Sequence, residues 1–119
     1  MIDVNGEQTF YVYNQAVDMR KSIDGLSYLV CEVLEGTPQS GGVYLFHNKA
    51  LDKVKLLYWD KNGFVLHYKR LEKGKFKLKR KADSPDEFSI SKQQLTWLLA
   101  GLDFNLMDEF KDLDYSNYY

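Results

Sequence analysis

Residues 53–70 read KVKLLYWDKNGFVLHYKR, two runs rich in aliphatic and aromatic residues that flank Asn62-Gly63. Asn-Gly between two such runs is the strongest short-range signal for a tight turn, so this stretch predicts a β-hairpin. Successive side chains of a strand point to opposite faces, and the face assignment is the same for a two-residue or a four-residue loop. One predicted face contains Lys53, Lys55, Leu57, Trp59, Phe64, Leu66, Tyr68 and Arg70, and the other contains Val54, Leu56, Tyr58, Val65, His67 and Lys69. Both faces are apolar near the turn, so we expect other elements to cover both.

Further β-prone runs and two helical patterns surround the hairpin. The β-prone runs are Thr9–Tyr13, Val43–His47, Lys75–Lys79 and Glu87–Ile90. A first helix is predicted from Met19 to about Glu35, with Asp18 as its N-cap. A second helix opens at Ser91 and Gln94, which have capping-box spacing, and ends near Gly101. Together these patterns predict an α+β fold, a small antiparallel sheet of about four to five strands packed with two helices.

Length and composition indicate a single domain. The chain has 119 residues, of which 45% are hydrophobic and 28% charged, as is ordinary for a globular domain. We assign residues 1–107 to this domain and expect the acidic, aromatic segment 108–119 to be a mobile tail. No basic-then-apolar leader pattern occurs, and no run approaches the roughly 20 apolar residues that span a membrane. The single cysteine, Cys31, lies in the apolar stripe of the first predicted helix and is expected to pack in the core. One cysteine cannot form an internal disulfide, and together with the lack of a leader pattern this favours a cytoplasmic protein.

The net charge of −1 conceals three blocks of opposite sign. Residues 1–48 carry six acidic and two basic side chains, residues 49–81 carry three and twelve, and residues 82–119 carry eight and two. Such segregation indicates a basic contact surface within an otherwise acidic protein, although three solvated faces would give the same pattern.

The predicted hairpin gathers cations at the end away from its turn. Lys53, Lys55 and Arg70 share a face with Tyr68, and like charges opposite one another destabilise a sheet. Either a bound phosphate or the nearby carboxylate of Glu72 would relieve this repulsion. The pattern leaves both interpretations open.

The run that begins at Lys75 has a second set of cations. Phe76 and Leu78 point one way, and the opposite side carries Lys75, Lys77, Lys79 and Lys81. These ammonium groups would track a phosphate backbone, or they would protect an edge strand against aggregation.

Arg20 and Lys21 lie in the first turn of the first predicted helix. Beside the free amide groups of that turn they would hold an anion. The alternative is that they pair with Asp18 and Asp24 as ordinary surface ion pairs, and we favour this pairing.

The sequence contains no recognisable catalytic apparatus. His47 and His67 fall within predicted strands, where a histidine is more often packed than used as a base. The chain has no phosphate-binding glycine loop, nucleophile elbow or zinc motif, and its acidic residues lack a spacing that demands a metal. We therefore expect a protein that is not an enzyme and that uses no metal or cofactor.

Several motifs, in this order, resemble those of a known family. They are Asp18-Met19-Arg20-Lys21-Ser22-Ile23-Asp24-Gly25-Leu26, Trp59-Asp60-Lys61-Asn62-Gly63-Phe64, Lys69-Arg70-Leu71-Glu72-Lys73-Gly74-Lys75-Phe76 and the Leu-rich run from Leu95 to Gly101. These runs resemble the Asp-x-Arg-Lys-Gly-x-Asp-Gly-Leu, Trp-Asp-x-x-Gly, Lys-Arg-Leu-Glu-x-Gly-x-Phe and closing Leu-rich segments of TnpB-type accessory proteins of insertion sequence family sixty-six. The resemblance extends over residues 9–104. Ser22 stands where that family has glycine, and residues 47–53 stand where it has an arginine-rich loop.

The resemblance implies a protein that accompanies a separate transposase and supports movement of the element. It does not extend to the longer RNA-guided nucleases that share the TnpB label, which have zinc-binding cysteines and an acidic catalytic triad. With the charge pattern, it leads to the hypothesis that element-end DNA is held through its phosphates by Arg20, Lys21, Lys53, Lys55, Arg70, Lys75, Lys77 and Lys79. Lysine outnumbers arginine in this set, which favours phosphate contacts over the reading of base edges.

Two other hypotheses belong to different classes of protein. An adaptor would dock on the transposase through its aromatic surface and acidic tail without contacting DNA. A hydrolase or nuclease would need a catalytic group, and the sequence offers none that is recognisable.

Overall fold

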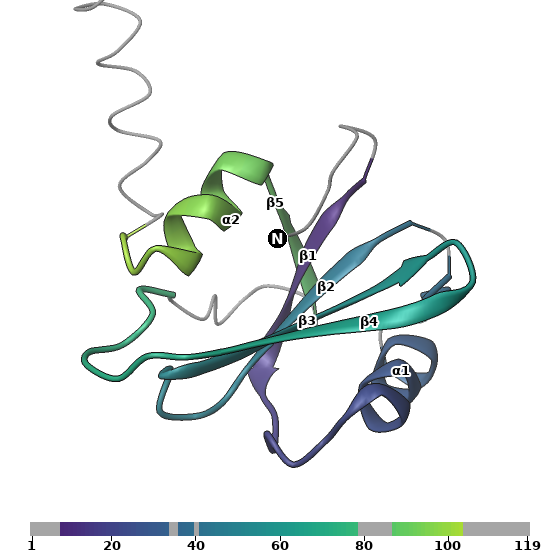
Figure 1. The fold of residues 1–119 in the computed structure, drawn as a ribbon, viewed down its shortest axis with the longest axis horizontal. Coiled ribbons are helices and arrows are strands. Elements are labelled where there is room, and N and C mark those ends of the chain that lie inside the picture. The colour runs from purple at the N-terminus through teal and green to yellow at the C-terminus, as the bar shows by residue number, and fades with distance from the viewer. Residues whose placement is uncertain (1–7, 34–35, 40, 79–86, 104–119) are drawn as a thin grey trace, which may run out of the picture.

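The fold is built on a five-stranded sheet with the strand order β4-β3-β2-β1-β5 (Figure 1). The strands are β1 (Phe10–Ala16), β2 (Val43–His47), β3 (Lys53–Asp60), β4 (Gly63–Arg70) and β5 (Glu87–Ile90). Two helices in the described residues, α1 (Ile23–Glu32) and α2 (Lys92–Leu99), flank the sheet. The computed structural model describes residues 8–33, 36–39, 41–78 and 87–103, so the predicted tail at 108–119 lies outside the described residues. The predicted α+β class is confirmed.

The hairpin of β3 and β4 forms with the predicted face assignment. Lys53 lies opposite Arg70, and Lys55 lies opposite Tyr68. The turn itself comes one residue earlier than the Asn-Gly signal indicates, because its two loop residues are Lys61-Asn62. Lys61 takes up the left-handed conformation of this turn, with φ of +53°. Moving the turn by one residue shifts every cross-strand partner by two positions, so each side chain stays on its predicted face of the sheet.

The sheet is mixed, which corrects the expectation of a wholly antiparallel sheet. β1 runs parallel to β2, with Phe10 beside Val43 and Val12 beside Leu45, whereas the other strand pairs are antiparallel. Parallel neighbours need a crossover connection, usually a helix, and α1 lies between β1 and β2 along the chain. Elements β1, α1 and β2 therefore form a strand–helix–strand unit, with an antiparallel hairpin added after it.

Helix α1 begins at Ile23 rather than at Met19. Its N-cap is Ser22, because the side chain of Asp18 is occupied by the backbone N–H and the guanidinium of Arg20. Lys21 N donates to the carbonyl oxygen of Asp18 at 3.0 Å, so residues 18–21 form a turn that precedes the helix. Arg20 and Lys21 therefore lie in the turn before the helix instead of in its first turn.

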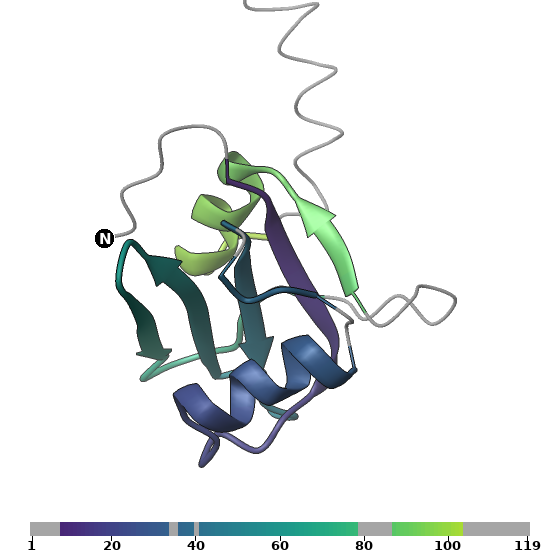
Figure 2. The ribbon, with the colours of Figure 1, turned by 90° about the vertical axis from the view of Figure 1, so that its right-hand side faces the viewer.

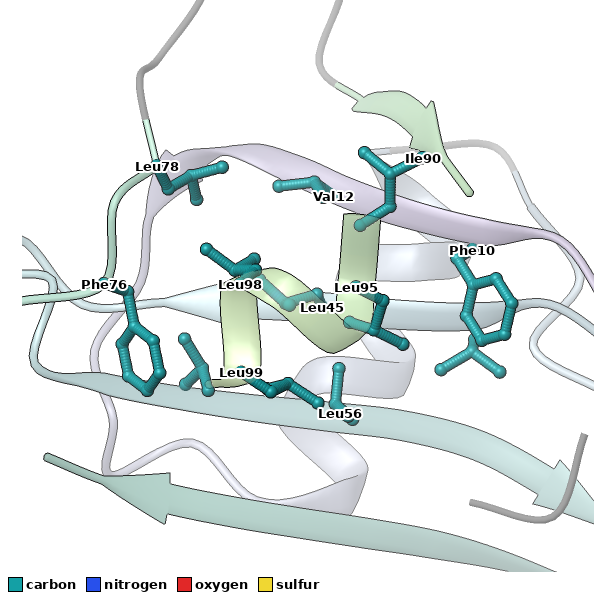
Figure 3. Packing of buried hydrophobic residues seen from close by; sticks show 12 residues of the cluster. Phe10, Val12, Leu45, Leu56, Phe76, Leu78, Ile90, Leu95, Leu98 and Leu99 are labelled. Carbon is teal, nitrogen blue, oxygen red and sulfur yellow. The ribbon is translucent and has the colours of Figure 1, made fainter. Parts of the chain in front are cut away.

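Each face of the sheet is covered by one helix, as Figures 1 and 2 show. Helix α1 packs Leu26 and Val30 against Phe46 and Leu57 on one face. The cluster on the other face, seen in Figure 3, consists of Phe10, Val12, Val43, Leu45, Val54, Leu56, Phe76, Leu78, Ile90, Leu95, Leu98 and Leu99. All residues of the middle strand β2 are buried because both of its faces are covered. The prediction that both faces of the hairpin are covered near its turn holds only for the middle of β3, where residues 54–57 are buried, because Tyr58, Trp59 and every residue of β4 keep part of their surface exposed.

The segment after β4 is irregular where a strand was predicted at Lys75–Lys79. Its described part alternates as expected, since Phe76 and Leu78 are buried in the cluster beneath α2 while Lys75 and Lys77 are exposed. Phe76 N donates to the carbonyl oxygen of Leu51 at 2.7 Å, so the segment is tied to the β2–β3 turn. Lys75 and Lys77 do not belong to an edge strand, so for these two described lysines the edge-protection interpretation loses its basis.

Helix α2 starts with the predicted capping box. Gln94 N donates to Ser91 Oγ at 3.0 Å, and Ser91 N donates to Gln94 Oε1 at 2.9 Å. The helix ends at Leu99 with Ala100 as its C-cap, and Gly101 follows with a φ of +83°, in the left-handed region that favours glycine after a helix.

Helix α1 leaves Cys31 exposed, which corrects the expectation that this cysteine packs in the core. The buried stripe of the helix passes through Leu26 and Val30, and Cys31 lies beside it. None of the helices in the described part of the chain is long and apolar enough to cross a membrane.

Candidate nucleic-acid interface

Basic segments that are distant in sequence meet at the end of the sheet opposite the β3–β4 turn. Val17 N donates to the carbonyl oxygen of His47 at 2.8 Å, which joins the end of β1 to the end of β2. Leu71 N donates to the carbonyl oxygen of Asp52 at 2.8 Å, which joins the end of β4 to the β2–β3 turn (left-hand side of Figure 1). We call residues 17–21, 48–53 and 69–77 the basic end. It carries nine Lys and Arg side chains, of which Lys69 points to the opposite face of the sheet, and three carboxylates.

The β2–β3 turn is held by the side chain of Asn48. Its Oδ1 accepts hydrogen bonds from the backbone N–H groups of Asp52 and Lys53, both at 3.1 Å, and its Nδ2 donates to Asp52 Oδ1 at 2.6 Å. The hydrogen bond from Asn48 lowers the pKa of Asp52 below its usual value. Leu51 adopts a φ of +58°, which is strained for a residue with a side chain. The turn is thus a fixed loop, and it presents Lys49 to solvent.

An open groove of about 570 Å³ lies between this turn and the residues that follow β1. Arg20, Lys49 and Lys53 supply its cations, Asp18 supplies a carboxylate, and Tyr68 supplies an aromatic ring. The three cations, one of them a guanidinium, suit a phosphate-bearing ligand. Lys49 was absent from the set predicted from the sequence. The available signal was its position in residues 47–53, where the family resembled by the motifs has an arginine-rich loop.

Lys55 lies inside the protein, where only 8% of its surface is exposed. Its Nζ donates to the backbone carbonyl oxygens of Met19 and Lys21, both at 2.7 Å, and lies 5.3 Å from the ring centroid of Tyr68. The ammonium group therefore fastens the 18–21 turn over β3 and β4. Because it is committed to these contacts, we remove Lys55 from the set of candidate phosphate ligands and treat it as support for the groove.

Arg20 is paired with Asp18, as the structural interpretation of this motif predicted. The guanidinium Nη2 lies 2.6 Å from Asp18 Oδ2, and the hydrogen bonds from Arg20 lower the pKa of Asp18 to about 2. The Arg20 side chain is 92% exposed, so this pair lies in water. Exposed pairs contribute only about 0–1 kcal/mol, and a phosphate can therefore displace the carboxylate.

Two further cations of the basic end also have carboxylate neighbours. Arg70 Nε donates to Glu72 Oε2 at 2.9 Å, which raises the pKa of Arg70 and confirms Glu72 as the structural partner of this arginine. Lys53 Nζ lies 3.8 Å from Asp52 Oδ1, a looser contact. The sheet therefore relieves its cation repulsion internally, and the repulsion between Lys53 and Arg70 is not by itself evidence for a bound anion.

The remaining predicted contacts lie at the margins of the basic end. Lys75 is exposed beside the β2–β3 turn, where its charge helps to lower the pKa of Asp52, and Lys77 is exposed two residues further on. Lys21 is exposed on the turn that precedes α1. Lys79 lies outside the described residues. Lys69 belongs to the opposite face, where its Nζ donates to the carbonyl oxygen of Leu99 at 2.6 Å and ties β4 to the end of α2.

Both histidines lie in strands and pack as predicted. His67 Nε2 lies 3.1 Å from the hydroxyl oxygen of Tyr58, and the two rings stack with centroids 5.6 Å apart. His47 is 2% exposed, with Nδ1 3.1 Å from the carbonyl oxygen of Asn48. Within the residues described, no group of three or more His, Cys, Asp or Glu side chains gathers to hold a metal ion.

The fold and this surface together define a small α+β domain whose cations converge at one end of a mixed sheet. The model of the family described as IS66 Orf2 like protein matches residues 8–109, and the chain belongs to this family. The resemblance read from the motifs is thereby confirmed. Membership associates the chain with an accessory role in the transposition of an insertion sequence.

Two curated relatives come from Sinorhizobium fredii (strain NBRC 101917 / NGR234). The uncharacterized protein y4jC is 38% identical over 98 residues, which cover 78% of each chain. The uncharacterized protein y4hO is 32% identical over 87 residues, which cover 73% of this chain and 74% of the relative. No solved structure matches the chain.

Proposed function

We propose that the protein is a non-catalytic accessory factor of transposition that holds DNA through its phosphates at the basic end and assists a separate transposase. The observation that supports this function is the convergence of Arg20, Lys49 and Lys53 around one groove, with Arg70 and Lys75 beside it. The segments that carry these cations are far apart in sequence, and they are fixed relative to one another by backbone hydrogen bonds.

The carboxylates of the basic end set the strength of this interaction without preventing it. Asp18 and Glu72 pair with arginines in water, where such a pair contributes little. A phosphate offers the same planar guanidinium two acceptor oxygens, and binding to DNA also releases condensed counterions. We therefore expect DNA affinity to depend strongly on salt and weakly on base sequence, because these side chains position the duplex without reading it.

The test is a titration of a fluorescently labelled element-end duplex, followed by anisotropy, at salt concentrations from about 50 to 200 mM. Four to five phosphate contacts give an expected log–log slope of about −4 to −5. An unrelated duplex of equal length should bind with similar affinity and the same slope. A slope near zero, or the absence of saturable binding, contradicts the proposal.

The second candidate function is a protein adaptor, and the outer face of α1 favours it. Tyr28 of α1 is 65% exposed, and Val33, the residue that follows the helix, is 38% exposed, so apolar side chains outside the basic end are open to a partner. An adaptor docked by such contacts would associate with the transposase with little dependence on salt, because apolar contacts are not screened. Salt-insensitive binding to the transposase, together with no binding to DNA, would make this the leading function.

A further inference from the structure

The aromatic ring in the basic groove has no role in the phosphate contacts described above. Tyr68 belongs to the edge strand β4, lines the groove and is 52% exposed. The ring contacts of the described chain pair Tyr11 with Tyr44, Tyr13 with Phe46, Tyr58 with His67 and Trp59 with Phe64. Tyr68 belongs to none of these pairs, so its ring presents surface to the groove.

The ring is also held in place from one side. It lies directly opposite Lys55 in the β3–β4 register, and the buried ammonium of Lys55 is 5.3 Å from its centroid. The same ammonium binds the carbonyl oxygens of Met19 and Lys21, so the ring, strand β3 and the 18–21 turn form one connected unit. An exposed aromatic ring that is fixed in this way is an effective stacking platform, because little side-chain freedom is lost when a ligand binds.

The cations around the ring specify the ligand. Arg20, Lys49 and Lys53 line the same groove, so a ligand stacked on Tyr68 has positive charge on its flanks. A nucleobase with phosphates on either side matches a ring flanked by cations, and this combination is the usual design of sites for single-stranded nucleic acid. A base in an intact duplex is stacked on both faces and cannot lie on the ring unless it leaves the helix.

We propose that Tyr68 is a base-stacking subsite for single-stranded DNA, such as a strand exposed when the end of an element is opened. This inference rests on the proposed function, since the same cations serve both DNA forms. It adds that the groove prefers a strand with free bases over a closed duplex, and that the preference comes from one ring. Sequence preference at this subsite is expected to be weak because every base has an aromatic face.

The test compares Tyr68→Leu, Tyr68→Phe and the matched control Tyr28→Leu, which removes an exposed tyrosine from α1. Affinity for a labelled oligodeoxythymidine is expected to fall about 5- to 150-fold in Tyr68→Leu and to be retained within a few-fold in Tyr68→Phe and in the control. Duplex affinity and both salt slopes should stay close to wild type in all three variants. Urea unfolding of each variant establishes that the fold is retained.

A second measurement does not depend on substitution. An oligonucleotide that carries 5-iododeoxyuridine, irradiated in the complex, should cross-link to the peptide that contains Tyr68. The inference is overturned if wild type does not bind single strands, if Tyr68→Leu binds them unchanged, or if the cross-link forms elsewhere. Equal loss of single-strand and duplex binding in Tyr68→Leu also overturns it, since the ring would then support the groove alone. If wild type binds single strands through Tyr68 but does not bind duplex DNA, the proposed function is contradicted while the Tyr68 subsite is supported.

Discussion

Replacing Lys49 and Lys53 together with glutamine is expected to weaken duplex binding about 60-fold at 0.1 M salt. Each phosphate contact contributes roughly 0.9 to the salt slope, and the corresponding loss of affinity at this salt concentration is about eightfold for each contact. Two lost contacts therefore multiply to about 60-fold and flatten the slope by about two units. Both side chains lie at the surface of the groove, and glutamine is polar, uncharged and only slightly shorter than lysine, so the fold should be retained.

The matched control replaces Lys61 and Lys92, which carry the same total charge but lie elsewhere. Lys61 is in the β3–β4 turn, at the other end of the two strands from Lys53, and Lys92 is the first residue of α2. This double variant is expected to keep wild-type affinity within a few-fold. Equal losses in the two double variants would show that net charge alone governs binding, and that the groove has no special role.

Replacing Phe76 with alanine is expected to destabilise the protein by about 3–5 kcal/mol. The ring is 1% exposed and packs in the buried cluster that includes Leu95, Leu98 and Leu99 of α2 (Figure 3). Its backbone N–H also ties the segment after β4 to Leu51 in the β2–β3 turn. A domain of this size has a total stability of about 5–15 kcal/mol, so the loss should be visible as a large shift of the urea midpoint.

The neighbouring Lys77 provides the control for this prediction. Its side chain is exposed, and Lys77→Ala should change the free energy of unfolding by no more than about 0.5 kcal/mol. The contrast between adjacent variants tests whether an irregular segment is anchored by alternate side chains. Similar, small effects of both substitutions would mean that the segment does not pack against α2 in solution.

Features with local causes could be predicted from the sequence. The β3–β4 hairpin, the capping box of Ser91 and Gln94, and the alternation of Phe76 and Leu78 each depend on residues within a few positions of one another. The predicted turn position was wrong by one residue, but the face assigned to each side chain stayed correct because the cross-strand partners shift by two positions.

Features that depend on distant contacts could not be predicted in the same way. The parallel pairing of β1 with β2 follows from where α1 returns the chain, and no local pattern specifies this. The start of α1 moved because the side chain of Asp18 binds Arg20 instead of capping the helix. Helix propensities and capping preferences do not include this side-chain interaction with Arg20, so they could not predict that Asp18 fails to cap the helix.

The candidate site was predicted in outline and corrected in detail. Alternation placed Lys53, Lys55 and Tyr68 on one face, as the structure has them. Alternation could not show that the 18–21 turn covers Lys55. This contact buries the ammonium group, so Lys55 supports the groove instead of facing solvent. Alternation also gave no reason to single out Lys49, because the role of this lysine in the groove arises from the fixed β2–β3 turn.

The most direct test of the account is a map of the protein surface that duplex DNA contacts. Backbone amide spectra of ¹⁵N-labelled protein, recorded while duplex is added, report each residue separately. If DNA binds at the basic end, we expect shift changes at residues 18–21, 48–53 and 68–77, with unchanged signals from the β3–β4 turn at 61–62 and from the start of α2 at 91–94. Changes centred on the outer face of α1 around Tyr28, or no saturable change at all, would contradict it.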